Sequence, residues 1–174
     1  MKTTRRGFLK TVAIPMVAAP FVLPSHVWAA PPSNKVVMGC VGMGKQSRGL
    51  LGAFLHRAQV VAVCDVDTTR RTDAQQKVQK HYKNTDCKAF VDYRELMAMK
   101  DINAVCIATP DHWHAAVTLA ALKSGKDVYC EKPLTWCLQE AVDVIKAVDE
   151  NKRVLQTGSM QRSSREFRIA AELV

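Results

Sequence analysis

The stretch KVVMGCVGMGKQSRG, residues 35–49, decides the fold. Its apolar start predicts a β-strand over 35–41, and a helix is expected over 47–57. Between them, Gly42 allows a tight turn and Gly44 lets the backbone approach a pyrophosphate. The helix start would then offer free amide donors and a partial positive charge to that anion. Ser47 replaces the third glycine of the usual dinucleotide pattern, so a plain strand–helix turn is an equally good interpretation of this motif alone.

Short apolar strands and amphipathic helices alternate along the rest of the chain. Further strands are expected at 59–64, 88–91, 104–108, 127–130 and 153–157, and helices at 68–82, 93–99, 114–123, 138–148 and from 163 onward. In the helix that follows residue 137, Leu138, Ala141, Val142, Ile145 and Val148 share one face, which predicts its buried side. Helical crossovers imply parallel pairing. We therefore expect an α/β fold with a doubly wound parallel sheet, six strands in the Rossmann order 3-2-1-4-5-6.

Composition and charge limit the classes of function that this chain can have. The chain has 174 residues, of which 48% are hydrophobic, enough for one domain with a core. The formal net charge is +9, but four of the 25 basic residues lie in the first ten positions. Without residues 1–29 the chain has 21 basic and 16 acidic side chains, a scattered excess with no long basic run. We therefore expect no nucleic-acid partner.

The N-terminal 29 residues are typical of a twin-arginine export signal. Arg5 and Arg6 precede an uncharged stretch over 11–24, and small residues near Ala29 predict cleavage after that position. Three prolines interrupt the apolar stretch, which is too short for a stable membrane-spanning helix. An uncleaved N-terminal anchor is the alternative. The signal predicts a periplasmic or exported protein with the twin-arginine machinery as a partner, folded around its cofactor before export.

Asp65 ends the second predicted strand, 21 residues after Gly44. A carboxylate there can accept hydrogen bonds from the adenosine ribose, which favours NAD over NADP. Arg70 and Arg71 follow closely and could instead neutralise the 2′-phosphate of NADP. The plainer alternative is that Asp65 and Asp67 only cap the next helix.

Two polar segments follow the fourth and fifth predicted strands, at the sheet edge where such folds bind ligands. The first is TPDHWH, residues 109–114, in which Trp113 is equally consistent with simple packing. The second is Glu131-Lys132-Pro133, where proline holds Lys132 in an extended backbone. A lysine there can hydrogen-bond a substrate hydroxyl and, if partly desolvated, take part in proton transfer. The alternative is a surface lysine paired with Glu131.

Six cysteines raise the question of disulfides in an exported protein. Cys40, Cys64, Cys106 and Cys130 lie within or at the end of apolar strands, where a thiol packs as a small hydrophobic group. The chain has no CxxC motif and no Cys/His metal spacing. We expect free structural thiols rather than a disulfide framework, and no metal site.

The whole chain after residue 34 resembles the N-terminal domain of the Gfo/Idh/MocA oxidoreductase family. The resemblance rests on the GMG turn at 42–44, ATPDHWHA at 108–115, CEKPL at 130–134 and LQTGSMQRS at 155–163, in that order. It implies an NAD(P)-dependent oxidoreductase that transfers a hydride between a sugar or polyol and nicotinamide, with Lys132 as the catalytic or substrate-positioning residue. The implied cofactor-binding residues are Gly42, Met43, Gly44, Lys45, Gln46, Asp65, Ala108, Thr109, Pro110, His112, His114, Glu131, Lys132 and Pro133. The implied substrate-binding residues are Lys132, Gln161 and Arg162.

The resemblance also predicts the organisation of the chain. A signal peptide over 1–29 would precede a nucleotide-binding domain over 30–160, and residues 161–174 would begin the connection to a second α/β domain. We expect that second domain, and with it most substrate contacts, to be absent, and the full-length form to be a homo-oligomer. Two alternatives stay open: an NAD-dependent glycoside hydrolase acting by oxidation and elimination, and a truncated nucleotide-binding module without turnover.

Overall fold

A computed structural model of the protein describes residues 35–173. Residues Lys35–Val174 form one compact unit. The twin-arginine signal and its cleavage after Ala29 lie outside the described residues. Within the described part, no helix is both long enough and apolar enough to cross a membrane.

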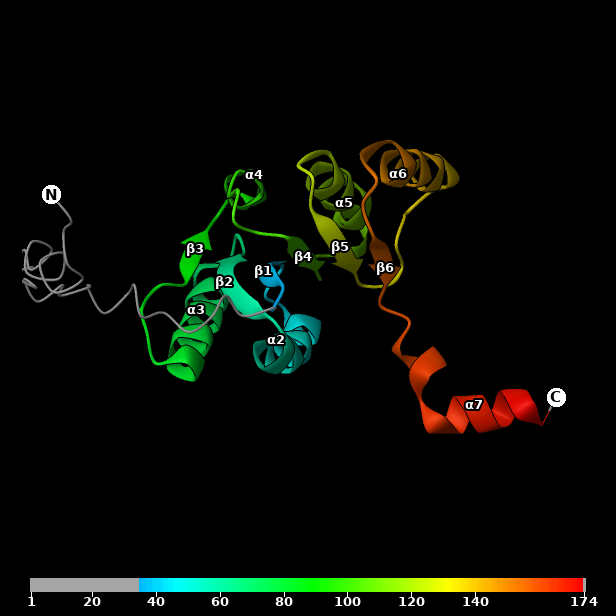
Figure 1. Ribbon diagram of the computed structural model, residues 1–174, viewed down its shortest axis with the longest axis horizontal. Helices are drawn as coiled ribbons and strands as arrows, with labels where there is room; N and C mark the ends of the chain where they lie inside the picture. Colours follow the sequence, from blue (N-terminus) through cyan, green and yellow to red (C-terminus); the bar gives the residue numbers. More distant parts are fainter. Residues whose placement is uncertain (1–34, 174) are drawn as a thin grey trace, which may run out of the picture. The chain divides into compact units, whose positions relative to one another are not determined.

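Six parallel strands form a single sheet in the order β3-β2-β1-β4-β5-β6, as predicted (Figure 1). The strands are β1 (Val37–Val41), β2 (Gln59–Cys64), β3 (Lys88–Phe90), β4 (Ala104–Ile107), β5 (Asp127–Cys130) and β6 (Leu155–Thr157). The helices are α2 (Lys45–Arg57), α3 (Thr68–Tyr82), α4 (Tyr93–Met97), α5 (His114–Lys123), α6 (Leu138–Asn151) and α7 (Arg165–Glu172). Short 3-10 turns η2 (Asp111–Trp113) and η3 (Met160–Ser163) precede α5 and α7. The chain reverses its winding between β1 and β4, and crevices at such reversals bind ligands.

Helices cover both faces of the sheet, which explains why its strands are apolar on both sides. Helices α2 and α3 pack on one face around Leu51, Leu55 and Val78. Helices α4, α5 and α6 pack on the other face around Leu96 and Leu122. Figure 1 shows these two layers below and above the strands. Helices do not cover the edge at which the strands' carboxyl ends lie. The loops between strands and helices lie there instead.

Several element boundaries differ from those predicted. Helix α2 begins at Lys45, two residues before the expected start, because Gly44 already takes the N-cap position. Strand β6 begins at Leu155 and not at residue 153. The residues 111–113, predicted as a loop before the fourth helix, form a 3-10 turn that leads into α5. These shifts change where loops start, but not the topology.

The apolar face predicted for α6 is only partly buried: Val148 packs against the core and Ala141 is half-buried. Leu138, Val142 and Ile145 are exposed by 82%, 51% and 64%, whereas Val144 and Ala147 are buried. Two neighbouring arcs of this helix are apolar, and periodicity alone cannot tell which one faces the core. The exposed arc leaves a row of large hydrophobic side chains on the surface.

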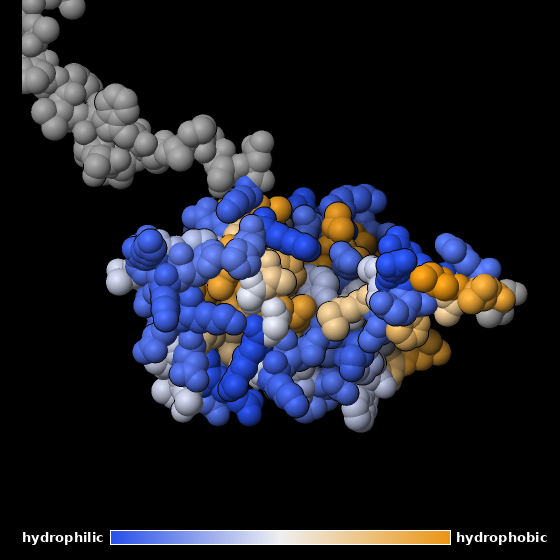
Figure 2. Space-filling view, turned by 90° about the horizontal axis from the view of Figure 1, so that it is seen from below, coloured by the Kyte–Doolittle hydropathy of each residue, from blue (hydrophilic) through white to orange (hydrophobic). Residues whose placement is uncertain are grey.

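Figure 2 shows another face of the molecule, largely hydrophilic, with hydrophobic residues gathered near its middle.

All six cysteines are free thiols, as expected. Cys40, Cys64, Cys106 and Cys130 are buried in the sheet, and Cys87 is buried just before β3. Burial raises the pKa of Cys64 and of Cys87 to about 12. These thiols therefore stay protonated and pack as apolar groups. Only Cys137, before α6, is exposed.

Candidate functional site

The loop after β1 is built around Gly42, which adopts a φ of 84°. A side chain is excluded there twice, because that φ disfavours L residues and a Cβ would lie 2.6 Å from the Thr109 nitrogen and 2.7 Å from the Ala108 oxygen. The amide of Gly42 donates to the Cys64 carbonyl at 2.9 Å. The loop is thus held between the ends of β2 and β4.

Gly44 caps α2 without a side-chain hydrogen bond, so the first amides of the helix stay available to a ligand. A Cβ at Gly44 would meet nothing within 4 Å, which means that the space above it is open. Ser47, in place of the third glycine, is buried, and its hydroxyl contacts the Met43 sulfur at 3.8 Å. The substitution therefore fits between helix and strand and leaves the anion-binding geometry intact.

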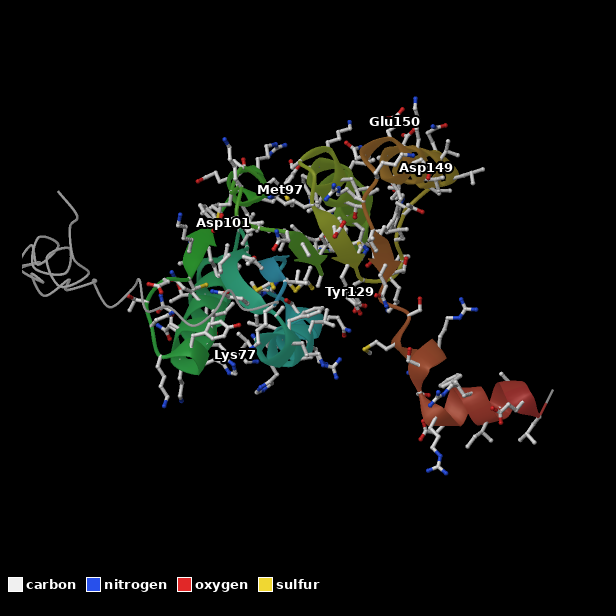
Figure 3. All side chains as sticks on the ribbon, viewed as in Figure 1. Lys77, Met97, Asp101, Tyr129, Asp149 and Glu150 are labelled. Carbon is white, nitrogen blue, oxygen red and sulfur yellow. The ribbon has the colours of Figure 1, made fainter. Side chains whose placement is uncertain are left out.

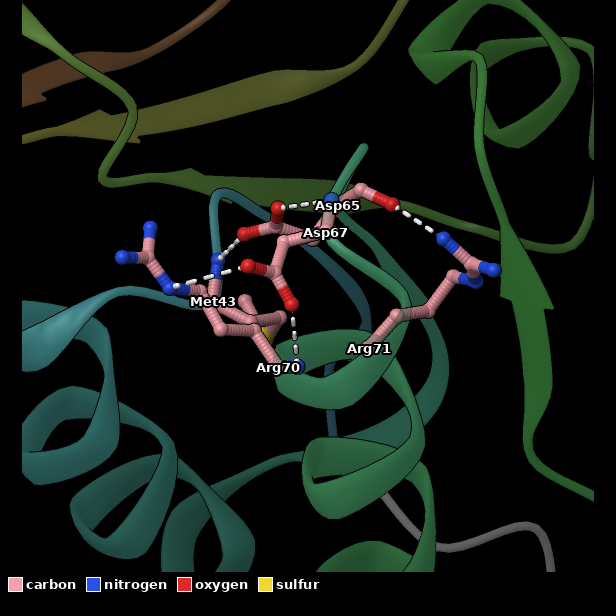
Figure 4. Close-up of polar contacts among 5 residues, drawn as sticks. All are labelled: Met43, Asp65, Asp67, Arg70 and Arg71. Atoms are coloured by element: carbon pink, nitrogen blue, oxygen red, sulfur yellow. Dashed lines mark hydrogen bonds and ion pairs between the residues drawn. The ribbon is translucent and has the colours of Figure 1, made fainter.

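Asp65 ties the end of β2 to this loop (Figure 4). Its carboxylate accepts a hydrogen bond from the Met43 amide at 2.6 Å and another from the Asp67 amide at 2.8 Å. The N-cap of α3 is Asp67, which accepts from the Arg70 amide at 3.0 Å. The capping alternative thus applies to Asp67, while Asp65 faces the loop and lines the cleft described below.

The two arginines after Asp65 already have partners. The Arg70 side chain lies 3.8 Å from the Asp67 carboxylate. Arg71 donates to the Asp65 carbonyl at 2.7 Å and to the Thr68 hydroxyl at 3.4 Å. Figure 4 shows Arg70 turned to Asp67 and Arg71 turned to the Asp65 carbonyl. Arg71 is therefore bonded to the main chain of Asp65 and to Thr68, and Arg70 is the one of the two that also lines the cleft.

A cleft of about 580 Å³ opens at the carboxyl ends of β1, β2, β3 and β4. Eight of the predicted cofactor-binding residues line it: Gly42, Gly44, Lys45, Gln46, Asp65, Ala108, Thr109 and Pro110. Met43 is buried beneath the loop, where its amide contacts Asp65. Four segments far apart in the sequence thus meet at one edge of the sheet.

The wall of the cleft beside β3 was missed by sequence reasoning. It contains Asp92, Tyr93 and Arg94 at the start of α4, and it faces Trp113. The rings of Tyr93 and Trp113 meet edge to face with centroids 6.3 Å apart. Trp113 is 45% exposed and lines the cleft, so it does more than pack. The predicted strand order could have revealed this wall. Because β3 lies beside β2, the residues that follow β3 lie next to Asp65.

NAD fits this cleft by the chemistry of its lining. Gly42 lets the loop lie against the main chain of Ala108 and Thr109, and Gly44 leaves open space at the start of α2, where the first helix amides can bind a pyrophosphate. Asp65 supplies a carboxylate for ribose hydroxyls. The Thr109 hydroxyl is buried and has no hydrogen-bond partner among the described residues, although it belongs to a cleft-lining residue. A buried hydroxyl without a hydrogen-bond partner costs free energy. A ligand group that hydrogen-bonds to the Thr109 hydroxyl would remove this cost.

The segment after β5 separates two neighbouring charges. The Glu131 side chain is buried and accepts from the Gln46 amide at 3.2 Å and from the Tyr129 hydroxyl at 3.3 Å. Lys132 is exposed and forms no ion pair with Glu131 within residues 35–173. The structure therefore does not contain the lysine–glutamate pair of the plainer alternative. The Lys132 ammonium is left available to a ligand.

His114 lies beneath the cleft and not in its lining. It is 1% exposed, and its ring nitrogens lie 2.5 Å from the Pro133 carbonyl and 2.9 Å from the Thr109 carbonyl. His114 thus connects the turn after β4 to the turn that carries Lys132. Its contact with the cofactor, which the resemblance implies, stays a prediction.

The remaining predicted site residues are solvent-exposed. His112 lies in η2 beside Trp113, with ring centroids 6.3 Å apart. Pro133 follows Lys132 through a cis peptide bond. Gln161 and Arg162 lie in η3, after β6. No cluster of three potential metal ligands occurs in the described part of the chain.

The sequence of this domain matches a known protein family. The model of the Gfo/Idh/MocA oxidoreductase family, an NAD-binding Rossmann fold, matches residues 34–159. The chain belongs to this family. The matched residues include every strand of the sheet and both turns that follow β4 and β5. The described fold is thus the NAD-binding domain of a Gfo/Idh/MocA oxidoreductase.

Curated Gfo/Idh/MocA relatives include two inositol 2-dehydrogenases. That of Burkholderia cenocepacia is 31% identical over 139 residues, which are 79% of this chain and 40% of the relative. That of Salmonella typhimurium is 35% identical over 127 residues, 72% of this chain and 36% of the relative. The chain therefore spans about 40% of the length of the curated relatives it matches.

Solved structures show the same fold. The myo-inositol 2-dehydrogenase of Lactobacillus plantarum superimposes with a TM-score of 0.71 at 21% identity, covering 80% of this chain and 40% of that protein. The scyllo-inositol dehydrogenase of Lactobacillus casei with bound NAD(H) and scyllo-inositol has a TM-score of 0.71 at 22% identity, with the same coverage. A probable dehydrogenase of Thermotoga maritima has a TM-score of 0.70 at 26% identity and covers 79% of this chain and 40% of that chain.

Proposed function

We propose that this chain is the cofactor-binding part of an NAD-dependent dehydrogenase that oxidises a secondary hydroxyl of a sugar or cyclic polyol. The observation that carries the proposal is the cleft at the winding reversal, where the Gly42 loop, Asp65 and the orphan Thr109 hydroxyl meet. The inositol 2-dehydrogenase relatives support a polyhydroxylated substrate.

The polar contacts around Asp65 favour NAD as the cofactor. A 2′-phosphate at this position would approach the Asp65 carboxylate and be repelled. The two arginines that follow Asp65 have other partners, since Arg71 is bonded to the Asp65 carbonyl and Arg70, although it lines the cleft, lies 3.8 Å from the Asp67 carboxylate. The ribose hydroxyls of NAD, in contrast, can donate to a carboxylate oxygen that already orders the loop.

Lys132 is the residue of this chain that acts on the substrate in the proposal. Its exposed ammonium, free of Glu131, would donate a hydrogen bond to the reacting hydroxyl oxygen and hold it in place. The nicotinamide ring supplies the hydride acceptor when the cofactor is bound. The His114 ring lies between the carbonyls of Thr109 and Pro133, with one ring nitrogen near each, and so packs the turn after β4 against the turn that carries Lys132.

Calorimetric titration of the 174-residue chain with NAD and NADP tests the cofactor assignment. We expect weak but measurable NAD binding and at least about tenfold weaker NADP binding, which corresponds to about 1.4 kcal/mol. Folded protein, as judged by circular dichroism, that binds neither nucleotide would overturn the proposal.

The role of Lys132 is tested in a full-length Gfo/Idh/MocA dehydrogenase that carries the same EKP segment. Replacing the lysine by alanine should lower kcat by at least about a hundredfold and leave NAD affinity nearly unchanged. Unchanged turnover would remove Lys132 from the mechanism.

Net formation of NADH with a free polyol distinguishes a dehydrogenase from a glycosidase that only cycles its bound cofactor.

We propose further that residues 1–29 direct export through the twin-arginine route. The support is the Arg5-Arg6 pair followed by an uncharged stretch, and the benefit of folding around a soluble cofactor before export. Replacing both arginines by lysine should retain the protein in the cytoplasm. Export of the double-lysine variant at the original level would contradict this proposal.

A further inference from the structure

Gly158, directly after β6, lies against the buried Glu131 side chain. A Cβ at Gly158 would lie 2.7 Å from Glu131 Oε1, 2.9 Å from Glu131 Cδ and 2.9 Å from the Tyr129 hydroxyl oxygen. Real Cβ atoms do not approach other heavy atoms so closely. Gly158 does not have a positive φ, so its backbone is open to other residues. Any side chain at position 158 would therefore force the Glu131 carboxylate or the Tyr129 hydroxyl to move.

The three atoms near Gly158 belong to one hydrogen-bonded group. Glu131 Oε1 accepts from both the Gln46 side-chain amide at 3.2 Å and the Tyr129 hydroxyl at 3.3 Å. Glu131 is only 4% exposed, so its position depends on these two donors. Gln46 in turn lies at the start of α2 and lines the cleft. The group thus links the phosphate-binding loop to the ends of β5 and β6.

Tyr129 is itself held in place. Figure 3 labels it between the sheet and α2. Its ring meets that of Phe54, in α2, edge to face with centroids 5.6 Å apart. Burial, together with the Glu131 charge, raises the pKa of Tyr129 to about 12. The phenol therefore remains a donor to the carboxylate at any ordinary pH.

The position of the hydrogen-bonded group around Glu131 in the sheet indicates which half of the cofactor it would lie beside. The part of the cleft beside Asp65, at the ends of β2 and β3, takes the adenosine half in the proposed function. A dinucleotide that crosses the winding reversal between β1 and β4 places its other half over β4 and β5. Glu131 directly follows β5, and Gly158 directly follows β6 beside it, where the Gly158 amide donates to the Cys130 carbonyl at 2.8 Å.

We propose that Gly158 is a positioning residue for the nicotinamide half of the cofactor. Its missing side chain gives the Glu131 carboxylate the space to be held by Tyr129 and Gln46. A methyl group there displaces the carboxylate from the nicotinamide end of the crevice and leaves the adenosine end untouched. The inference rests on the proposed function, because it takes the end of β5 as the nicotinamide side.

The test compares NAD with ADP-ribose, which has the same nucleotide part but lacks nicotinamide. Both are titrated calorimetrically into the 174-residue chain and its Gly158→Ala variant. We expect Gly158→Ala to weaken NAD at least about fivefold, as expected for losing a charge-assisted contact. ADP-ribose affinity should stay within about twofold. If wild-type protein binds neither ligand, the proposed function fails, and not this inference alone.

Gly49→Ala is the matched control, because a Cβ at Gly49 meets nothing within 4 Å. It should leave both affinities unchanged. Equal weakening of NAD and ADP-ribose by Gly158→Ala would show general damage to the domain and overturn the inference. Unchanged affinity for both ligands would overturn it as well.

A second pair of variants keeps the test decisive if Gly158→Ala folds poorly. Tyr129→Phe removes one donor to Glu131 without adding bulk, and it should lower NAD affinity about threefold relative to ADP-ribose. Glu131→Asp in the Gly158→Ala background withdraws the carboxylate by one methylene group. This double variant should regain thermal stability without regaining the preference for NAD. No shift in that preference in Tyr129→Phe would contradict the proposal.

Discussion

The Asp65 carboxylate accepts a hydrogen bond from the backbone amide of Met43 at 2.6 Å, so the end of β2 holds the loop that follows β1. The same carboxylate accepts from the Asp67 amide at 2.8 Å. Two main-chain donors therefore fix its orientation toward the cleft. A residue expected to recognise a ribose thus also shapes the loop that would receive the pyrophosphate.

Asp65→Ala should weaken NAD binding by about 10-fold to 100-fold, because it removes a charged acceptor and releases the loop amide. Calorimetry with NAD measures the loss. Asp67→Asn is the control, since Asp67 caps α3 outside the cleft lining and asparagine caps helices equally well. Equal affinities for wild type and Asp65→Ala would exclude the ribose and loop role.

Gly42→Ala should destabilise the domain by more than about 2 kcal/mol and abolish NAD binding. The backbone there has a φ of 84°, and a Cβ would meet the main chain at Ala108 and Thr109, which cannot rotate away. Urea unfolding of Gly42→Ala beside Gly49→Ala measures the difference. Gly49 lies in α2 with open space around it, so its substitution should be neutral or slightly stabilising. Similar unfolding midpoints for the two variants would refute the steric argument.

A thiol-specific reagent should modify the native chain at Cys137 first. This cysteine is exposed, while the other five are buried. Absorbance of the released chromophore should show one fast equivalent, with the other five appearing only after unfolding in denaturant. Cys137→Ser should lose the fast phase alone. Two or more fast equivalents in the native protein would be incompatible with the sheet as described.

Stability should fall as the pH rises above 9. Burial raises the pKa of Cys87 from 9.0 to about 12 and that of Cys130 from 9.0 to about 11. Folded thiols therefore keep protons that unfolded thiols release. Their contribution is complete below pH 9 and is lost as the pH rises through the folded values. Urea midpoints between pH 8 and pH 10.5 should decline less steeply in Cys87→Ala than in wild type, and parallel profiles would speak against the shift.

Local signals were sufficient for much of this fold. Apolar runs such as Val60–Val63 predict strands covered on both faces, and the crossovers between them then leave few topologies. Asp65 and the Gly42 turn were predictable for the same reason, since each lies at a fixed offset from a strand. These features depend on neighbours in the chain.

The parts that sequence reasoning missed depend on neighbours in space. Leu138 and Val144 are both apolar residues of α6, yet only packing decides that Val144 is buried and Leu138 is 82% exposed. Tyr93 enters the cleft because β3 pairs with β2. The need for glycine at position 158 arises from a side chain 27 positions earlier. No local period or spacing contains that information.

The contact between Gly42 and Ala108 has a consequence for how the protein forms. The two residues are 66 positions apart, and the insertion of β4 beside β1 brings them together. Closing so long a segment carries an entropic cost that only the completed sheet offsets. Before β4 joins the sheet, the Gly42 loop lacks its contact with Ala108 and Thr109, and the cleft lacks the wall that these residues form. We therefore expect nucleotide binding to require β4 in place, because Ala108, Thr109 and Pro110 behind it complete the cleft.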